Sequence, residues 1–99
     1  MKLYISGKIT DTSPEKQSAN LAKFDEVAGI LREAGHEVFN PAELEVKGGA
    51  TWEYYLARDL KWIYENRPTL YVMSGYETSL GAKLEIEFAE LIGLDIMYC

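Results

Sequence analysis

"KLYIS", residues 2–6, is a short apolar run that ends at Gly7. A run of this length bounded by glycine is typical of a strand that is buried on both faces. Similar runs follow at 36–41, 69–73 and 95–99, where the sequence reads "HEVFNP", "TLYVM" and "DIMYC". The sequence therefore predicts four short strands.

Helical patterns fill the segments between these runs. Ser13 has the residue type of an N-cap, and Gly35 is suited to end the helix that begins there. Two further helices are predicted over 52–66 and 80–93, where apolar residues recur at steps of three and four. The segment 43–51, which contains two adjacent glycines, is predicted to be a loop.

Strands joined by helices need crossover connections, which are right-handed and produce a parallel sheet covered on both faces. We predict one α/β domain over residues 1–99: a small, doubly wound, flavodoxin-like fold with a parallel four-stranded sheet in the order 2-1-3-4 and three helices. Ligands bind such sheets beyond the carboxyl ends of the strands. The functional residues are therefore expected in the turns "SGKIT", "NPAE" and "SGYETSLG" and the helices next to them.

Composition excludes several classes of function. The formal charge is −6, which repels a nucleic-acid polymer but leaves room for a small anionic ligand at a cluster of backbone amides. The single cysteine, Cys99, and the single histidine, His36, argue against a disulfide and a structural zinc site, and we expect neither metal nor cofactor. No apolar run approaches the ~20 residues that cross a bilayer, and no signal peptide is evident, so a cytoplasmic protein without membrane contact is expected.

Asp59 falls on the apolar face of the helix predicted over 52–66. It lies on the same side as Trp52 and Ile63, because the residues of this face recur every three or four positions. A carboxylate buried there needs hydrogen bonds from the protein or from a ligand. Asp59 is therefore either an aspartate bonded to a neighbouring loop or a functional acid. Three other charged residues of this helix, Glu53, Arg58 and Lys61, are expected to face the solvent.

Glu85 borders the apolar face of the last predicted helix, beside Phe88 and Ile92. Gly81 and Ala89 stand one turn to either side of it, and small residues at this spacing predict an open groove along the carboxylate. Glu85 is therefore either a salt-bridged glutamate at the edge of the core or an acid that a substrate can approach. The predicted buried face of this helix consists of Leu84, Phe88, Leu91 and Ile92.

Two turns are suited to hold an anion. The first follows the opening strand, where backbone amides near Gly7 and the charge of Lys8 could hold a phosphate, although the spacing is not that of a P-loop. The second precedes the last helix, where Ser79 is a candidate N-cap at the positive helix end. The candidate substrate-binding residues from the two turns are Ser6, Gly7, Lys8, Ile9, Ser79 and Gly81.

Three motifs together resemble the nucleoside 2-deoxyribosyltransferase superfamily along nearly the whole chain. They are "LYISGKI" at 3–9, "RDLKWI" at 58–63 and "SLGAKLEIEFA" at 79–89. Ser79 stands six residues before Glu85, which is similar to the 2′-deoxynucleoside 5′-phosphate N-hydrolase branch. In that branch the serine holds the 5′-phosphate. The segment "GHEVFNP" also looks like that of small uncharacterised phage and bacterial proteins with this pattern.

The resemblance implies a catalytic role for three residues. Glu85 would be the nucleophile that captures the anomeric carbon as the N-glycosidic bond breaks, forming a glycosyl ester. Tyr4 would hydrogen-bond and orient this glutamate. Asp59 would protonate the departing base, and its place on an apolar face would raise its pKa. The implied substrate is a small molecule, a deoxynucleoside or its 5′-monophosphate.

Two departures from the family pattern leave other functions open. Glu87 stands where family enzymes commonly have a glycine, and family members often continue past the position of Cys99 to complete a neighbour's site. The alternative to an enzyme is a non-catalytic nucleotide-binding module on the same fold. A protein that only binds other proteins is a third, weaker interpretation.

A homodimer or larger assembly is also expected, because the resembled family builds its sites at a dimer interface and a small domain gains stability by burying more surface. The helix over 52–66 carries more aromatic side chains than one sheet face can cover. These residues are Tyr54, Tyr55, Trp62 and Tyr64.

Overall fold

In the computed structural model, which describes residues 1–44 and 51–99, four parallel strands form one sheet in the order β2-β1-β3-β4. The predicted α/β fold and strand order are confirmed. The strands are β1 (Lys2–Ser6), β2 (Glu37–Phe39), β3 (Thr69–Val72) and β4 (Ile96–Tyr98). The helices are α1 (Pro14–Glu33), α2 (Trp52–Asn66) and α3 (Leu80–Leu91), with short 3₁₀ turns at Pro41–Leu44 and Tyr76–Thr78.

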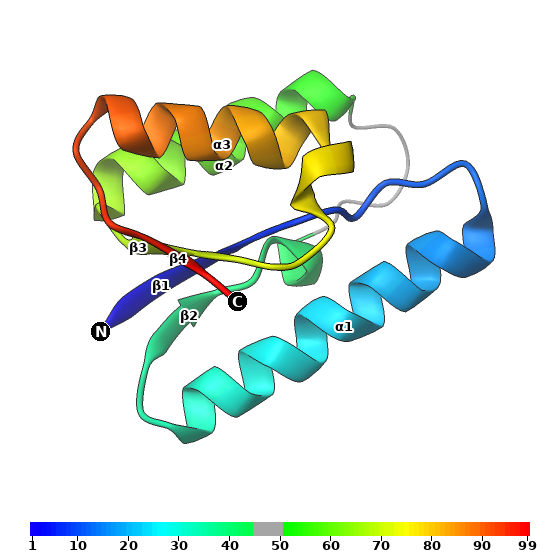
Figure 1. Ribbon diagram of the computed structural model, residues 1–99, viewed down its shortest axis with the longest axis horizontal. Coiled ribbons are helices and arrows are strands. Elements are labelled where there is room, and N and C mark those ends of the chain that lie inside the picture. The colour runs from blue at the N-terminus through cyan, green and yellow to red at the C-terminus, as the bar shows by residue number, and fades with distance from the viewer. Residues whose placement is uncertain (45–50) are drawn as a thin grey trace.

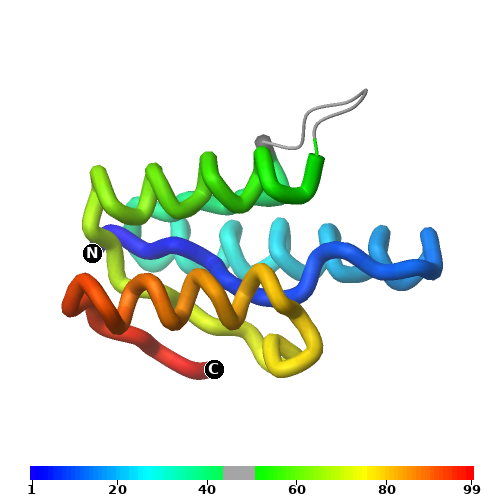
Figure 2. Tube along the Cα trace, turned by 90° about the horizontal axis from the view of Figure 1, so that it is seen from above, coloured from blue at the N-terminus to red at the C-terminus, as the bar shows by residue number. Residues whose placement is uncertain are grey.

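The sheet is the middle of three layers. Helix α1 covers one face, while α2 and α3 lie together on the other (Figure 1). Seen from above, α2 and α3 run side by side, and β1 follows the line between them in the sheet layer below (Figure 1 and Figure 2). This arrangement places Asp59 on α2 and Glu85 on α3 above the same strand, β1. Most of the loop predicted over 43–51 lies outside the described residues.

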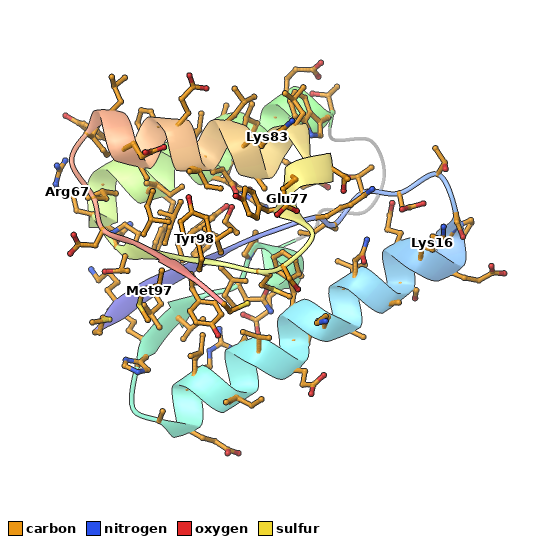
Figure 3. The ribbon with its side chains drawn as sticks, viewed as in Figure 1. Lys16, Arg67, Glu77, Lys83, Met97 and Tyr98 are labelled. Carbon is orange, nitrogen blue, oxygen red and sulfur yellow. The ribbon has the colours of Figure 1, made fainter. Side chains whose placement is uncertain are left out.

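Each helix end has a local cause in the sequence. The side chains of Ser13 and Ser79 accept hydrogen bonds from backbone amides three residues on, as N-caps do. Gly35 has a φ of +93°, which suits the left-handed position after a helix. Arg67 ends α2 in the same conformation and donates to the carbonyl of Ile92 at 2.7 Å, so the ends of α2 and α3 are tied together (Figure 3).

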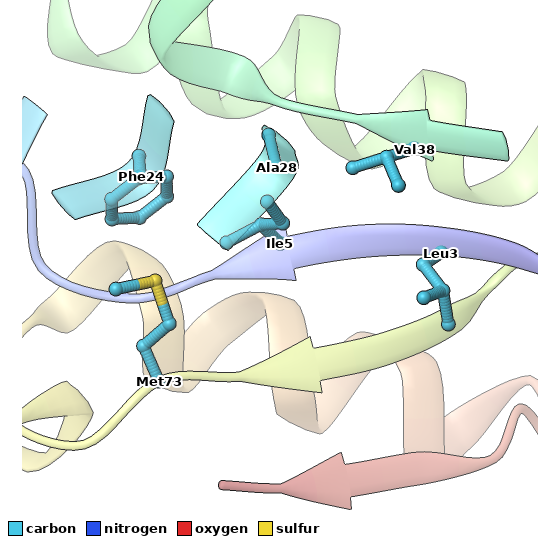
Figure 4. Packing of buried hydrophobic residues seen from close by; sticks show 6 residues of the cluster. All are labelled: Leu3, Ile5, Phe24, Ala28, Val38 and Met73. Carbon is cyan, nitrogen blue, oxygen red and sulfur yellow. The ribbon is translucent and has the colours of Figure 1, made fainter. Parts of the chain in front are cut away.

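The core consists of two clusters, one on each face of the sheet. Because successive residues of a strand point to opposite faces, β1 contributes Leu3 and Ile5 to the α1 side and Tyr4 and Ser6 to the other. The α1-side cluster contains Leu3, Ile5, Phe24, Ala28, Val38 and Met73 (Figure 4). The cluster under α2 and α3 contains Tyr4, Ile63, Leu70, Val72, Ile86 and Ala89.

The buried face predicted for α3 is wrong in part. Phe88 and Ile92 pack against the second cluster, but Leu91 is 83% exposed. The face is rotated because α3 packs against both α2 and the sheet, and alanines let the helix approach closely. Its buried residues are Ala82, Glu85, Ile86 and Ala89, so Glu85 lies inside the buried face rather than at its border.

Gly7 is required by close packing at the end of β1. A Cβ atom added there would lie 3.2 Å from Met73 Cβ and 3.3 Å from the Phe24 ring. We expect Gly7→Ala to lower the free energy of unfolding by about 1 to 2 kcal/mol, because the core must shift to admit the methyl group. Chemical denaturation measures this change.

The matched control is Gly29→Ala. Gly29 is exposed within α1, and an added Cβ would meet nothing within 4 Å. Alanine favours the helix, so this variant should be about 0.5 to 1 kcal/mol more stable than the wild type. If Gly7→Ala and Gly29→Ala are equally stable, the residues around Gly7 can accept a methyl group at no cost, and the close packing there does not require glycine.

Candidate active site

The carboxyl group of Glu85 is buried and held by two hydroxyls of β1. Tyr4 Oη donates to Oε2 at 2.5 Å and Ser6 Oγ donates to Oε1 at 2.8 Å. Tyr4 and Ser6 are two positions apart, so they point to the same face of the sheet, under α3. Glu85 itself is only 7% exposed. Each oxygen of the Glu85 carboxyl group accepts a hydrogen bond, and these two bonds fix its orientation.

Burial raises the pKa of Glu85 to about 8, from an ordinary value of 4.5. The hydrogen bonds from Tyr4 and Ser6 favour the ionised form and oppose this shift, while the negative charge of Asp59 adds to it. Glu85 is consequently protonated in most molecules at neutral pH when the site is empty.

Asp59 is the second buried acid, on α2 and 7% exposed. Burial raises its pKa, while the hydrogen bonds and charge of Arg58 lower it. The pKa of Tyr4 is raised well above its ordinary value, first by burial and then by the charges of Glu85 and Asp59. The Tyr4 hydroxyl therefore interacts with both acids, and the three groups form one electrostatic unit.

Arg58 corrects one sequence prediction, because it does not simply face the solvent. Its Nε and Nη2 atoms donate to Asp59 Oδ1 at 3.0 and 2.8 Å, and its side chain is 22% exposed. The guanidinium also lies over the ring of Tyr55, 5.2 Å from the ring centre. Glu53 and Lys61 are exposed, as predicted.

A cavity of about 290 Å³ opens beside the two acids, at the carboxyl ends of β1 and β3. Most of its wall comes from the turn after β1, the first two turns of α2 and the start of α3, and Ile5, Phe24, Pro41 and Thr78 complete it. The residues that line it include Ile9, Trp52, Leu56, Arg58, Asp59, Ser79, Gly81 and Glu85.

The predicted substrate-binding residues divide into three groups. Gly7, Ile9, Ser79 and Gly81 line the cavity. Ser6 is fully buried and contacts Glu85, so it supports the acid rather than lining the cavity. Lys8 lines a separate, smaller cavity of about 150 Å³ and forms an ion pair with Asp11 at 3.7 Å.

The groove predicted along Glu85 exists on one side only. Gly81 lines the cavity, and a Cβ atom added to it would lie 3.7 Å from the indole nitrogen of Trp52. Ala89 is completely buried in the core, so that side of Glu85 is packed. Glu87, two residues after Glu85, is exposed on the opposite side of α3. The cavity therefore reaches Glu85 from the N-terminal end of the helix.

Sequence reasoning missed several residues of the cavity wall. The sequence pattern places Trp52 in the core and Tyr55 at a surface for association, whereas both line the cavity. Their position in the first turns of α2, at the carboxyl edge of the sheet, is the signal that could have placed them there. Thr10, Pro41 and Thr78 also line it; they lie in the three turns where functional residues were expected, but were not singled out.

Neither a cluster of metal ligands nor a membrane-spanning helix is seen in the described part of the chain. No three His, Cys, Asp or Glu side chains there gather as metal ligands would. Among the helices described, none is long and apolar enough to cross a membrane.

A family model matches nearly the whole chain. Residues 1–98 match the family described as domain of unknown function DUF4406, so the chain belongs to that family. A search of curated proteins found no match.

Proposed function

We propose that this DUF4406 protein cleaves or transfers at the N-glycosidic bond of a deoxynucleoside or its 5′-monophosphate, with Glu85 as the nucleophile. The observation that carries the proposal is the buried Glu85 carboxyl, gripped by Tyr4 and Ser6 at the wall of a cavity of about 290 Å³. That volume is near the lower end for small-molecule sites. The resemblance to the nucleoside 2-deoxyribosyltransferases also supports the proposed activity. We place the reaction in the cytoplasm, with no resident cofactor.

The proposed chemistry has two steps. In the first, a Glu85 oxygen bonds to C1′ of the sugar while the bond from C1′ to the base nitrogen breaks; the base keeps the electron pair and takes a proton from Asp59. In the second, water or another base attacks C1′, the ester bond breaks, and Glu85 returns to a carboxylate. The proton that the incoming group loses restores Asp59.

The cavity offers different surroundings to the two ends of such a substrate. Ser79 accepts a hydrogen bond from Ala82 N at 3.1 Å, and the same hydroxyl can donate to a phosphate oxygen beside the positive end of α3. The apolar wall formed by Ile9, Trp52 and Leu56 suits the flat face of a base. A 5′-monophosphate fits this division better than a sugar alone.

A non-catalytic nucleotide-binding module is the second candidate. One observation favours it: burial raises the pKa of Glu85 to about 8, so the empty site at neutral pH holds the acid mainly in its protonated, non-nucleophilic form. A module that only binds would need no ionised glutamate.

One experiment separates the two. Chromatography would measure free base released from each deoxynucleoside and its 5′-monophosphate, between pH 6 and 9, and calorimetry would measure binding of the same compounds. Base release above the no-protein control supports the enzyme. Binding without release supports the module, and neither would overturn both proposals.

We also propose a homodimer that forms through α2. Tyr54 and Tyr64 are 54% and 60% exposed there, whereas Trp62 packs 4.2 Å from the ring of Phe39, measured between ring centres, and is less available than expected. We expect light scattering to give twice the monomer mass at tens of micromolar protein, an order of magnitude suited to weak association. Tyr64→Glu should shift the mass toward the monomer, because a charge in an apolar interface is costly. A wild-type monomer at these concentrations would contradict the proposal.

A further inference from the structure

We infer that Arg58 is a positioning residue, which holds Asp59 as the carboxylate in the empty site and thereby leaves on Glu85 the proton that the two buried acids hold between them. Neither the sequence pattern nor the family match assigns a role to Arg58. The inference rests on how differently the two acids are held.

The contact between Arg58 and Asp59 is unusual for neighbours on a helix. Residues one position apart do not face each other, so the arginine must curl back to reach its partner. It does so with two donors on one oxygen, Nε at 3.0 Å and Nη2 at 2.8 Å, and its side chain is mostly withdrawn from solvent. The ring of Tyr55 beneath the guanidinium helps to hold this conformation.

Glu85 is held by weaker partners. Tyr4 and Ser6 are neutral hydroxyl donors, whereas the donor to Asp59 carries a full positive charge. The guanidinium adds the attraction of a full positive charge to its hydrogen bonds, and a neutral hydroxyl does not supply this attraction to a carboxylate. The ionised form is therefore better supported on Asp59 than on Glu85. Burial raises the pKa of both acids; at Asp59 the hydrogen bonds and charge of Arg58 are the first causes that oppose the rise, whereas at Glu85 the charge of Arg58 is the smallest opposing cause and the pKa reaches about 8.

Within residues 1–44 and 51–99, the other groups that shift the pKa values of the two acids come from two elements. Tyr4 lies beneath them on β1, and Arg58 lies beside them on α2. On α3 the nearby charged residues, Lys83 and Glu87, are exposed. The balance between the acids therefore depends chiefly on Arg58.

This distribution matters if the proposed function holds. The reaction needs an ionised Glu85 and a protonated Asp59, which is the reverse of the empty site. A bound substrate must then loosen the grip of Arg58 so that the proton can pass to Asp59, and the Tyr4 hydroxyl, which interacts with both acids, lies on that route. Only this consequence rests on the proposed function; the proton distribution itself does not.

Carboxyl-selective ¹³C NMR titration of the ligand-free protein tests the inference without any turnover. The titrations compare wild type with Arg58→Gln, Arg58→Lys and the control Lys61→Gln, which removes the same charge from an exposed position of α2. In the wild type, Glu85 should take up its proton at a higher pH than Asp59. In Arg58→Gln the Asp59 midpoint should rise by about one to three pH units.

The other variants make the result specific. Arg58→Lys should give an intermediate midpoint, because it keeps the charge but loses the two-donor geometry. Lys61→Gln should leave both midpoints unchanged. The inference is overturned if Asp59 protonates before Glu85 in the wild type, or if Arg58→Gln leaves the Asp59 midpoint where it was. Absence of base release in the wild type would count against the proposed function alone.

Discussion

Glu85→Gln is expected to reduce base release by at least three orders of magnitude, which corresponds to ~4 kcal/mol or more in the activation barrier. The amide keeps the size of the side chain and can still accept a hydrogen bond from Tyr4 or Ser6, whose hydroxyls can rotate to suit it. It cannot form an ester with C1′, because the amide oxygen carries no negative charge and is a poor nucleophile. Initial rates on the best substrate of the panel measure the loss.

The matched control is Glu87→Gln. It makes the same chemical change two residues further along α3, at an exposed position outside the cavity, so its rate should match the wild type. Calorimetry should give nearly the same dissociation constant for all three proteins, because the lost interaction forms only in the transition state. A Glu85→Gln variant that releases base at more than a tenth of the wild-type rate would show that Glu85 is structural.

The fold could be predicted from sequence because its signals are local. β1, β3 and β4 are short apolar runs, and the side chains of Ser13 and Ser79 cap their helices as the residue types suggest. Alternation of strands and helices then leaves few topologies, since crossovers are right-handed. The prediction for Leu91 is wrong because the spacing of apolar residues alone suggests that this leucine is buried. In the structure, α3 turns its alanines toward the sheet and α2 instead, and Leu91 is exposed.

The site was only partly predictable, because its contacts join residues that are far apart in the sequence. A buried acid on a helix is visible as a break in the hydrophobic pattern, which singled out Asp59 and Glu85. The partners of an acid are not local: Tyr4 meets Glu85 across 81 positions of sequence, and this contact was predicted from the family resemblance rather than from the spacing. Arg58 was missed because helical geometry places adjacent side chains on different sides, and only the curled conformation of this arginine brings it to Asp59.

The stability of the wild type relative to Glu85→Gln is expected to fall as the pH rises from 4.5 to about 8. In the unfolded chain Glu85 loses its proton near 4.5, whereas in the folded protein burial raises its pKa to about 8. Between these values the folded state holds one proton more than the unfolded state, so stability declines with pH. Each unit of difference corresponds to ~1.4 kcal/mol, and the whole interval to about 3 to 5 kcal/mol.

Comparing the two proteins isolates this one group. Below pH 4.5 both states of the wild type are protonated, and glutamine resembles the protonated acid, so the two proteins should unfold alike. Above pH 8 the variant should melt on the order of 10 °C or more higher, because the wild type carries a buried charge to which the hydroxyls of Tyr4 and Ser6 donate hydrogen bonds. Groups distant from Glu85 titrate equally in both and cancel in the difference. Thermal melts at half-unit steps from pH 4 to 9 measure it, and a difference that stays flat across this range would mean that water reaches Glu85 and that its pKa is ordinary.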